Sequence, residues 1–368
     1  MDPGRPPTAS GAVSGPISSA RRPDHARWGP HKYRRRVGIT GRDRHDGVVP
    51  ESRRPAVGMD ALVAWCRRWL GAPPAAELFE AGYLSTVKGL RLADGREVVV
   101  KVRPRLPRLA GCAIVHRALW TAGFPCPEPL ADLQPLDGYA ATAETLVLDA
   151  GEPPDSELAA LSAAALARLV ELAPGPGSVP SLAPSPSWTG WDHTEPGLWP
   201  APEDLDVDLN AHPQPQWLDR IAAAVRDHLH DYAGDPVIGH GDWHPENLRW
   251  HGPHLIAVHD WDSVICQPEP AIVGLAAASF LGIDGPPAMA SVEDSAAFLD
   301  AYQRARGRRW RSQDYAACWA AGLWQRAFDA KTRSLDGDPE QILFRHEARA
   351  RLRLAGLDPG LAAEAHQT

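Results

Sequence analysis

Apolar and polar positions alternate in one part of this chain and recur at helical spacing in most of the rest. The alternation lies between residues 78 and 102, where β-branched residues are frequent and the dipeptide Asp94-Gly95 predicts a two-residue hairpin turn. We therefore expect three antiparallel strands joined as a meander, at residues 78–82, 86–92 and 97–102. Lys101 lies near the end of the third strand. A further short strand is expected at 142–148.

Helical spacing predicts one helix before the meander and several after it. The first begins at Asp60, a good N-cap, and ends before Gly71. The others are expected at residues 109–122, 157–172, 217–232, 271–281, 293–305, 312–333 and 339–355. Residues 174–202 are rich in Pro, Ser and Trp and predict a long ordered insertion or lid.

Charge separates the first 58 residues from the others. They hold 12 Lys/Arg and 5 Asp/Glu, a net of +7, and the whole chain carries −8, which leaves −15 for the other 310 residues. This basic segment has no apolar periodicity, so we expect residues 1–58 to be a disordered extension. It is either a tail that binds nucleic acid or another anionic surface, or an upstream stretch ahead of a true start at Met59. The acidic body argues against nucleic acid as a partner.

Composition excludes several classes of protein. The five cysteines are too few for a disulfide scaffold, and no CxxC pair suggests a structural zinc site. The longest apolar run, residues 272–283, is too short to span a bilayer, and no secretory signal follows the first methionine. We therefore expect a cytoplasmic protein with no membrane partner.

The candidate chemistry lies between residues 237 and 262. Asp242 and Asn247 are five residues apart on a segment that Pro245 keeps from being helical, and a predicted hairpin brings Asp260 back beside Asn247. Two carboxylates and an amide oxygen are ligands that suit Mg²⁺ together with substrate phosphates. With Lys101 as a cation, this is the set that phosphoryl transfer needs.

The run His240-Gly241-Asp242-x-x-x-x-Asn247, followed by Asp260-Trp261-Asp262, resembles the aminoglycoside phosphotransferase and choline kinase-like family of the protein-kinase-like superfamily. The resemblance covers roughly residues 75–330. It implies an α+β fold of two lobes, with a small β-rich N-lobe at 59–149 and a mainly helical C-lobe at 150–368. The N-lobe would bind nucleotide, and the C-lobe would carry the catalytic loop and bind substrate.

The resemblance also implies a role for each site residue. Asp242 would be the catalytic base, Asn247 and Asp260 would bind Mg²⁺, and Lys101 would contact the α- and β-phosphates of the nucleotide. His240 would hold the catalytic loop in place.

The adenine and phosphate contacts are implied in the same way. Residues 144–148, including Glu144 and Leu146, would meet adenine through their backbone. Ser85 and Thr86, in a loop that is poor in glycine, are the candidates to contact phosphates.

One departure from the family concerns the partner of Lys101. The family usually has a Glu in the N-lobe helix that pairs with the strand lysine, and Cys112 stands at that place. No acidic residue lies between Arg103 and Arg117. A non-catalytic or weakly active nucleotide-binding protein is therefore the alternative to an enzyme.

Other residues keep a second interpretation. Lys101 alone could be an ordinary strand lysine. Asp262 could replace Asp260 as the metal ligand, or it could orient the loop or face the substrate cleft. His244 and His259 lack a third His or Cys at zinc spacing.

The insertion also has two interpretations. Asp192 and Trp191 belong to a Trp-rich stretch whose residues 192–208 contain six carboxylates. They form either an aromatic and acidic wall for a cationic substrate or a packed loop with a solvated acidic rim.

The sequence thus predicts an ATP-dependent, or GTP-dependent, O-phosphotransferase that uses Mg²⁺. Its acceptor is expected to be a hydroxyl of an aminoglycoside-like or other small, cationic compound. We expect a monomer or a homodimer.

Overall fold

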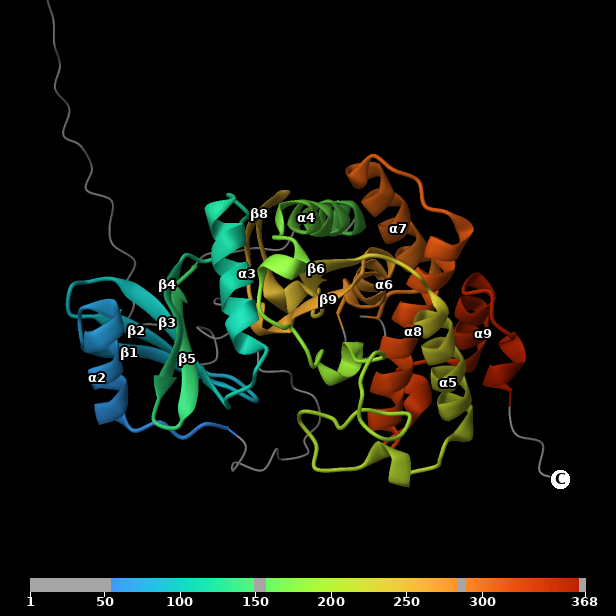
Figure 1. Ribbon diagram of the computed structural model, residues 1–368, viewed down its shortest axis with the longest axis horizontal. Helices are drawn as coiled ribbons and strands as arrows, with labels where there is room; N and C mark the ends of the chain where they lie inside the picture. The colour runs from blue at the N-terminus through green and yellow to red at the C-terminus, as the bar shows by residue number, and fades with distance from the viewer. Residues whose placement is uncertain (1–53, 149–156, 283–288, 364–368) are drawn as a thin grey trace, which may run out of the picture.

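The computed structural model describes residues 54–148, 157–282 and 289–363 and has a small β-rich lobe beside a larger helical lobe (Figure 1). The N-lobe contains one five-stranded antiparallel sheet with the strand order β1-β2-β3-β5-β4. Its elements are α2 (Met59–Leu70), β1 (Pro74–Ala81), β2 (Thr86–Leu92), β3 (Glu97–Arg103), α3 (Leu109–Thr121), β4 (Pro129–Leu136) and β5 (Tyr139–Thr145). The predicted α+β fold is confirmed.

The two faces of this sheet pack differently because successive side chains of a strand point to opposite faces. One face packs against α2, which buries Leu62, Trp65 and Leu70. Val99 lies on the other face, in a smaller apolar cluster with Phe79. Lys101 shares that second face, two residues further along β3, and reaches the C-lobe.

The sequence did not predict β4. Pro129 and Pro135 lie within it, and its pairing with β5 is irregular at two places. Proline lacks the N–H that a strand ladder uses, so β4 is tolerated because it is the edge strand of the sheet.

The described chain begins before the expected start of the fold. Arg54 donates to Oε1 of Glu80 at 2.6 Å and to the carbonyl of Ala81 at 2.9 Å, and the buried Pro55 accepts a hydrogen bond from the Thr86 hydroxyl at 2.6 Å. Residues 54–58 therefore pack on the N-lobe, contrary to the expected boundary at Met59. The rest of the predicted extension, residues 1–53, lies outside the described residues.

The C-lobe is mainly helical and holds two short pairs of antiparallel strands near its junction with the N-lobe. Strands β6 and β9 form one antiparallel pair, and β7 and β8 form the other. The elements are α4 (Leu158–Leu172), α5 (Gln216–Asp231), β6 (Pro236–His240), β7 (Leu248–His251), β8 (His254–Val258), β9 (Val264–Pro268), α6 (Glu269–Ser279), α7 (Val292–Arg306), α8 (Ser312–Arg333) and α9 (Arg345–Leu354). The last helix is shorter than predicted, because residues 339–341 form a separate 3₁₀ turn.

Helices α6 and α8 cross at the centre of this lobe. Every residue of α6 is buried. At the crossing, a Cβ on Gly274 would lie 2.0 Å from the Cys318 carbonyl oxygen, and one on Gly322 would lie 2.7 Å from the Gly274 carbonyl oxygen. The two backbones approach this closely only because both positions are glycine.

Helix α3 is bound to both lobes. On the side of the N-lobe, Arg117 pairs with Asp132 of β4 and donates to the carbonyl of Pro129 at 3.0 Å. Arg108, just before the helix, donates to the carbonyls of Val264 at 2.5 Å and Leu182 at 3.3 Å. Further along the helix, the ring of His116 stacks on Trp261 with 4.9 Å between ring centroids.

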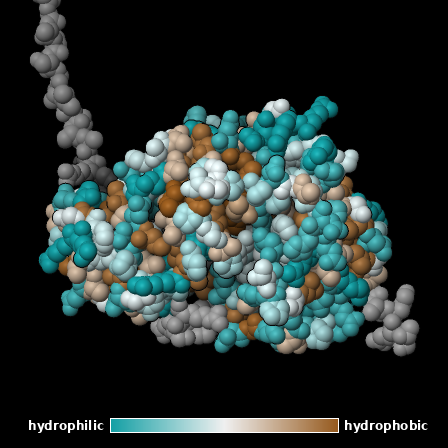
Figure 2. All heavy atoms as spheres, in the orientation of Figure 1, coloured by the Kyte–Doolittle hydropathy of each residue, from teal (hydrophilic) through white to brown (hydrophobic). Residues whose placement is uncertain are grey.

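Apolar surface gathers toward the middle of the face shown in Figure 2.

In the parts of the chain that the structure describes, no helix is both long and apolar enough to cross a membrane.

Candidate active site

The catalytic loop follows β6 and is organised by His240, which is fully buried. Its Nε2 lies 3.0 Å from the carbonyl oxygen of His259, and its Nδ1 accepts from the backbone N–H of Asp242 at 3.2 Å. Burial lowers the pKa of His240, so the ring is neutral and its single proton lies on Nε2. The ring thus ties the loop that carries Asp242 to the end of β8, as the expected supporting role requires.

Two donors hold the Asp242 carboxylate. The side-chain amide of Asn247 donates to Oδ2 at 3.1 Å and to the Asp242 carbonyl at 2.9 Å, and Nε2 of His244 lies 3.1 Å from the same Oδ2. Burial disfavours the imidazolium, but Asp242 and Glu246 outweigh it and raise the pKa of His244 to about 9. At neutral pH a buried cation therefore faces the carboxylate of Asp242.

Lys101 reaches across the cleft from β3 to the opposite lobe. Its ammonium contacts Oδ1 of Asp260 and lies 2.7 Å from Oδ2 of Asp262, whose other oxygen pairs with Arg103. These four groups form an alternating chain of charges between the lobes.

The backbone conformation of Asp260 and its ion pair with Lys101 both affect its carboxylate. It has a φ of 62°, in the left-handed region, and its Oδ2 accepts from the Ser263 hydroxyl at 3.1 Å. Burial would raise the pKa of Asp260, but Lys101 outweighs burial and lowers it to about 2. The carboxylate is therefore ionised across the physiological range.

The donor set fits Mg²⁺. Asp260 supplies ionised oxygens, and Asn247 turns its amide nitrogen toward Asp242, which leaves the amide oxygen on the opposite side. Hard oxygen ligands of this kind, completed by phosphates and waters, are what Mg²⁺ prefers. Among the described residues no cluster of three His, Cys, Asp or Glu side chains suggests another metal.

The two predicted phosphate contacts, Ser85 and Thr86, have different surroundings in the structure. Ser85 lies in the tight turn between β1 and β2, where a Cβ on Gly82 would come within 2.0 Å of the Ser85 carbonyl oxygen. Thr86 is only 3% exposed, and its hydroxyl is occupied by Pro55 and by Arg54. The Thr86 hydroxyl is therefore not directed at a ligand, because residues before the expected fold boundary occupy it.

The predicted adenine contacts lie at the end of β5. Glu144 has its carboxylate 3.5 Å from Nδ1 of His259, and Leu146 donates its backbone N–H to the Glu97 carbonyl at 3.2 Å. The Leu146 side chain packs beside Phe79 and Val99. Glu144 thus presents a side chain to the cleft, which the sequence analysis did not anticipate, and Leu146 extends an apolar surface.

The tryptophans of the insertion do not form an aromatic wall. Trp188, Trp191 and Trp199 are 9%, 6% and 2% exposed, and the indole N–H of Trp191 donates to Gln267 at 3.2 Å. The Trp188 indole donates to the Gly241 carbonyl at 3.0 Å. These rings pack the insertion against the catalytic loop, as the alternative interpretation of a packed loop proposed.

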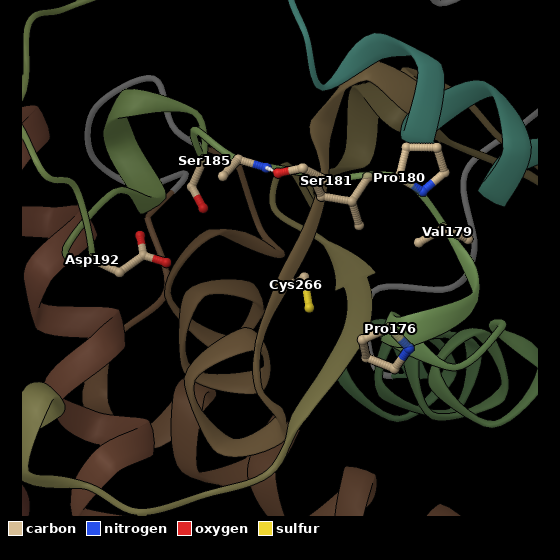
Figure 3. Close-up of a pocket in the computed structure, with 9 residues that line it drawn as sticks. Pro176, Val179, Pro180, Ser181, Ser185, Asp192 and Cys266 are labelled. Carbon is tan, nitrogen blue, oxygen red and sulfur yellow. Dashed lines mark hydrogen bonds between the residues drawn. The ribbon is translucent and has the colours of Figure 1, made fainter.

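Asp192 has a different environment. It lines a cavity of about 260 Å³ between the insertion and β9, together with Ser185 and Cys266 (Figure 3). Its Oδ1 accepts from the Gln267 amide at 3.2 Å, and burial raises its pKa. Cys266 belongs to β9 and pairs with Ile238 of β6, the strand that leads to Asp242.

Sequence reasoning missed two residues of this site. His244 was weighed only as a zinc ligand, and Arg103 was not considered. The sequence positions of both residues could have indicated them. Arg103 lies two residues after Lys101 on one strand and so shares its face. His244 lies two residues after the candidate base, Asp242.

The comparisons with known proteins agree with this geometry. The family model described as "Phosphotransferase enzyme family" (APH) matches residues 75–318. No match was found among curated proteins.

Solved structures share the fold at low sequence identity. A putative aminoglycoside phosphotransferase from Ralstonia eutropha JMP134 is 18% identical, with a TM-score of 0.51 over 85% of this chain and all of that one. Spectinomycin phosphotransferase APH(9)-Ia, solved with ADP and spectinomycin, is 13% identical, with a TM-score of 0.51 over 82% of this chain and 96% of that one. A thermostable mutant of aminoglycoside phosphotransferase APH(4)-Ia, in a complex with ADP and hygromycin B, is 14% identical, with a TM-score of 0.51 over 80% of this chain and 98% of that one. The chain belongs to the APH phosphotransferase family.

Proposed function

We propose that the chain transfers the γ-phosphate of ATP, or of GTP, to a hydroxyl of a small molecule. One observation carries this: a carboxylate held by two donors, Asp242, shares the cleft with the charge chain that begins at Lys101. A hydroxyl acceptor needs an oriented carboxylate to take its proton, and a polyphosphate needs cations that neutralise its charge.

In this reaction Asp242 orients the hydroxyl and takes its proton as the oxygen attacks the γ-phosphorus. The bond from phosphorus to the bridging oxygen breaks, and the nucleoside diphosphate leaves with that electron pair. Asp260 and the amide oxygen of Asn247 would hold Mg²⁺, which supplies charge neutralisation when bound. Lys101 would contact the α- and β-phosphates, and Ser85 would approach them through its turn.

The acceptor site we propose is the cavity beside Asp192. Its lining is mainly small and apolar, and Asp192 is its one carboxylate. Such a site suits a compact acceptor with one amine for Asp192 and an apolar body. Two proteins of similar fold were solved with spectinomycin and with hygromycin B, each together with ADP. We keep the cytoplasmic location and the monomeric or homodimeric state as predictions.

The test is a thermal-shift screen of ATP and GTP with Mg²⁺, followed by small hydroxylated amines in the presence of the nucleotide that binds. We expect a nucleotide to raise the Tm and a subset of amines to raise it further. Transfer of labelled phosphate to those amines, lost in Asp242→Asn, would support an enzyme. Nucleotide binding with no transfer to any acceptor would favour a non-catalytic binding protein.

A further inference from the structure

Lys101 is a cation that needs a partner in a partly closed cleft. Its side chain is 22% exposed, and an unpaired charge at such a depth is costly. Helix α3 packs beside it, and no carboxylate occurs anywhere in the sequence of α3. Cys112 of α3 lines the same small cavity as Lys101, and burial raises the pKa of its thiol to about 11, so it stays neutral.

Asp262 occupies the place between α3 and Lys101. One carboxylate oxygen lies 2.7 Å from the Lys101 ammonium, and the other pairs with Arg103. The carbonyl of Asp262 also accepts a weak hydrogen bond from the Cys112 thiol at 3.7 Å. The two carboxylate oxygens thus bridge two cations of one strand, and the backbone of Asp262 is tied to α3.

Asp260 also contacts Lys101, but the two carboxylates differ in what else they can do. Asp260 turns its second oxygen to Ser263 and is the proposed metal ligand. When its oxygens turn to a metal, Asp262 is the carboxylate that remains on Lys101. Asp262 is also the carboxylate that fixes Arg103, which lies on the same face of β3.

We propose that Asp262 is the positioning residue that holds Lys101 for the nucleotide phosphates, in the place that a carboxylate on α3 would otherwise fill. This rests on the proposed function, because it requires that the cleft binds a nucleotide. It assigns Asp262 to the cation and leaves the metal and the acceptor to other residues.

The test compares nucleotide with nucleoside. Calorimetry measures the affinity of the chain for the β,γ-imido analogue of ATP or GTP with Mg²⁺, and for the corresponding nucleoside. In Asp262→Asn the analogue should bind about tenfold more weakly, since a hydrogen bond to a charged group is lost, while the nucleoside is unaffected. A merely structural role would weaken both ligands together.

A matched control removes a carboxylate from the same region. Asp132 lines the small cavity that also contains Lys101 and Cys112, but it is 55% exposed and pairs with Arg117. Asp132→Asn should leave both affinities within about twofold, because exposed ion pairs contribute little.

Rescue is the decisive arm. Cys112→Glu in the Asp262→Asn background places a carboxylate on α3 and should restore most of the lost affinity for the analogue. Cys112→Glu alone should give no gain, because Asp262 already serves Lys101. Asp262→Asn could fail to fold because Arg103 loses its partner. In that case the double variant Arg103→Gln, Asp262→Asn, which also removes the unpaired charge, replaces it in the affinity measurement and in the rescue experiment.

The outcomes separate the inference from the proposed function. If the unmodified chain binds neither analogue, the proposed function fails, and the inference fails with it. If the chain binds an analogue and Asp262→Asn binds it equally well, or Cys112→Glu does not rescue, only the assignment of Asp262 is overturned.

Discussion

Asp242 has its carboxylate fixed before any acceptor arrives. Asn247 donates to one of its oxygens and His244 contacts the same oxygen, so its orientation does not depend on a substrate. A base that is already oriented avoids the entropy cost of being positioned during the reaction. It follows that changes at Asp242 should act on the chemical step rather than on nucleotide binding.

Asp242→Asn tests this directly. Phosphate transfer to an acceptor found in the screen should fall by about 10²–10⁴, the usual effect of losing a general base. The affinity for nucleotide, measured by calorimetry, should change by only a few-fold, because the base acts on the acceptor. If the variant kept most of its turnover, the proton of the hydroxyl would have to leave by another route.

His244 predicts a pH dependence of stability. Its pKa is about 9 in the folded chain and about 6.5 when unfolded. The folded state therefore keeps a proton that the unfolded state loses, so the stabilisation is complete below about pH 6.5 and is lost as pH rises through 9. Urea unfolding at both pH values should give a lower free energy of unfolding at the higher pH.

His244→Gln is the control for that measurement. Glutamine can still donate to Asp242 but does not titrate, so the part of the pH dependence due to this site should disappear. An unchanged pH dependence in the variant would show that other groups cause it.

The site residues differ in how far the sequence could predict them. Asp242, Asn247 and Asp260 share one short segment whose turns can be read locally, and the structure gathers the first two in one hydrogen-bonded group beside the third. The partner of Lys101 depends on a contact between residues about 160 positions apart, so periodicity carries no information about it. The Thr86 hydroxyl likewise depends on a segment expected to lie outside the fold.

At the scale of elements, the contact of α6 with α8 sets the geometry under the catalytic loop. α6 directly follows β9, and β9 pairs with the strand that leads to Asp242. The two helices touch through Gly274 and Gly322. A displacement of α6 would therefore be transmitted to the catalytic loop.

Gly274→Ala should destabilise the protein. The added methyl group would lie 2.0 Å from a backbone oxygen of α8, and overpacking of a close contact typically costs about 1–3 kcal/mol. The free energy of unfolding in urea measures this loss. Gly175→Ala, where nothing lies within 4 Å of the new Cβ, should change it by no more than about 0.5 kcal/mol. Equal stability of the two variants would contradict the tight crossing.

Elements with strong local patterns could be predicted, and those that depend on tertiary contact could not. The meander and the long helices have clear periodicity, and the structure confirms them. Strand β4 contains two prolines and has no clean alternation, so only its place at the sheet edge explains it. The tryptophans of the insertion could be ligands or core, and the pattern alone could not decide between these.

At the scale of the whole molecule, the segment before α2 is part of the N-lobe. Arg54 pairs with Glu80 and also contacts Thr86, and Pro55 is buried against the sheet. Residues 54–58, which their composition predicts to be disordered, are therefore part of the fold.

A protein that begins at Met59 should be less stable than one that begins at Arg54. Loss of the Arg54 contacts and of the buried Pro55 is worth about 1 kcal/mol, or about 2–4 °C in Tm. Calorimetry on the two proteins measures the difference, and Arg54→Ala in the longer one should reproduce part of it. Equal Tm values would restore Met59 as the boundary of the fold.

The attachment of α3 has a mechanical consequence. Arg108 and His116 bind this helix to β9 and to Trp261, and Arg117 binds it to β4 of the sheet through Pro129 and Asp132. The helix therefore couples the sheet of the N-lobe to the catalytic loop. A rotation of the sheet that opened the cleft would strain these attachments and would draw Lys101 away from Asp260 and Asp262 together. The ion pairs of Lys101 with these two carboxylates thus hold the two lobes together and also form part of the site.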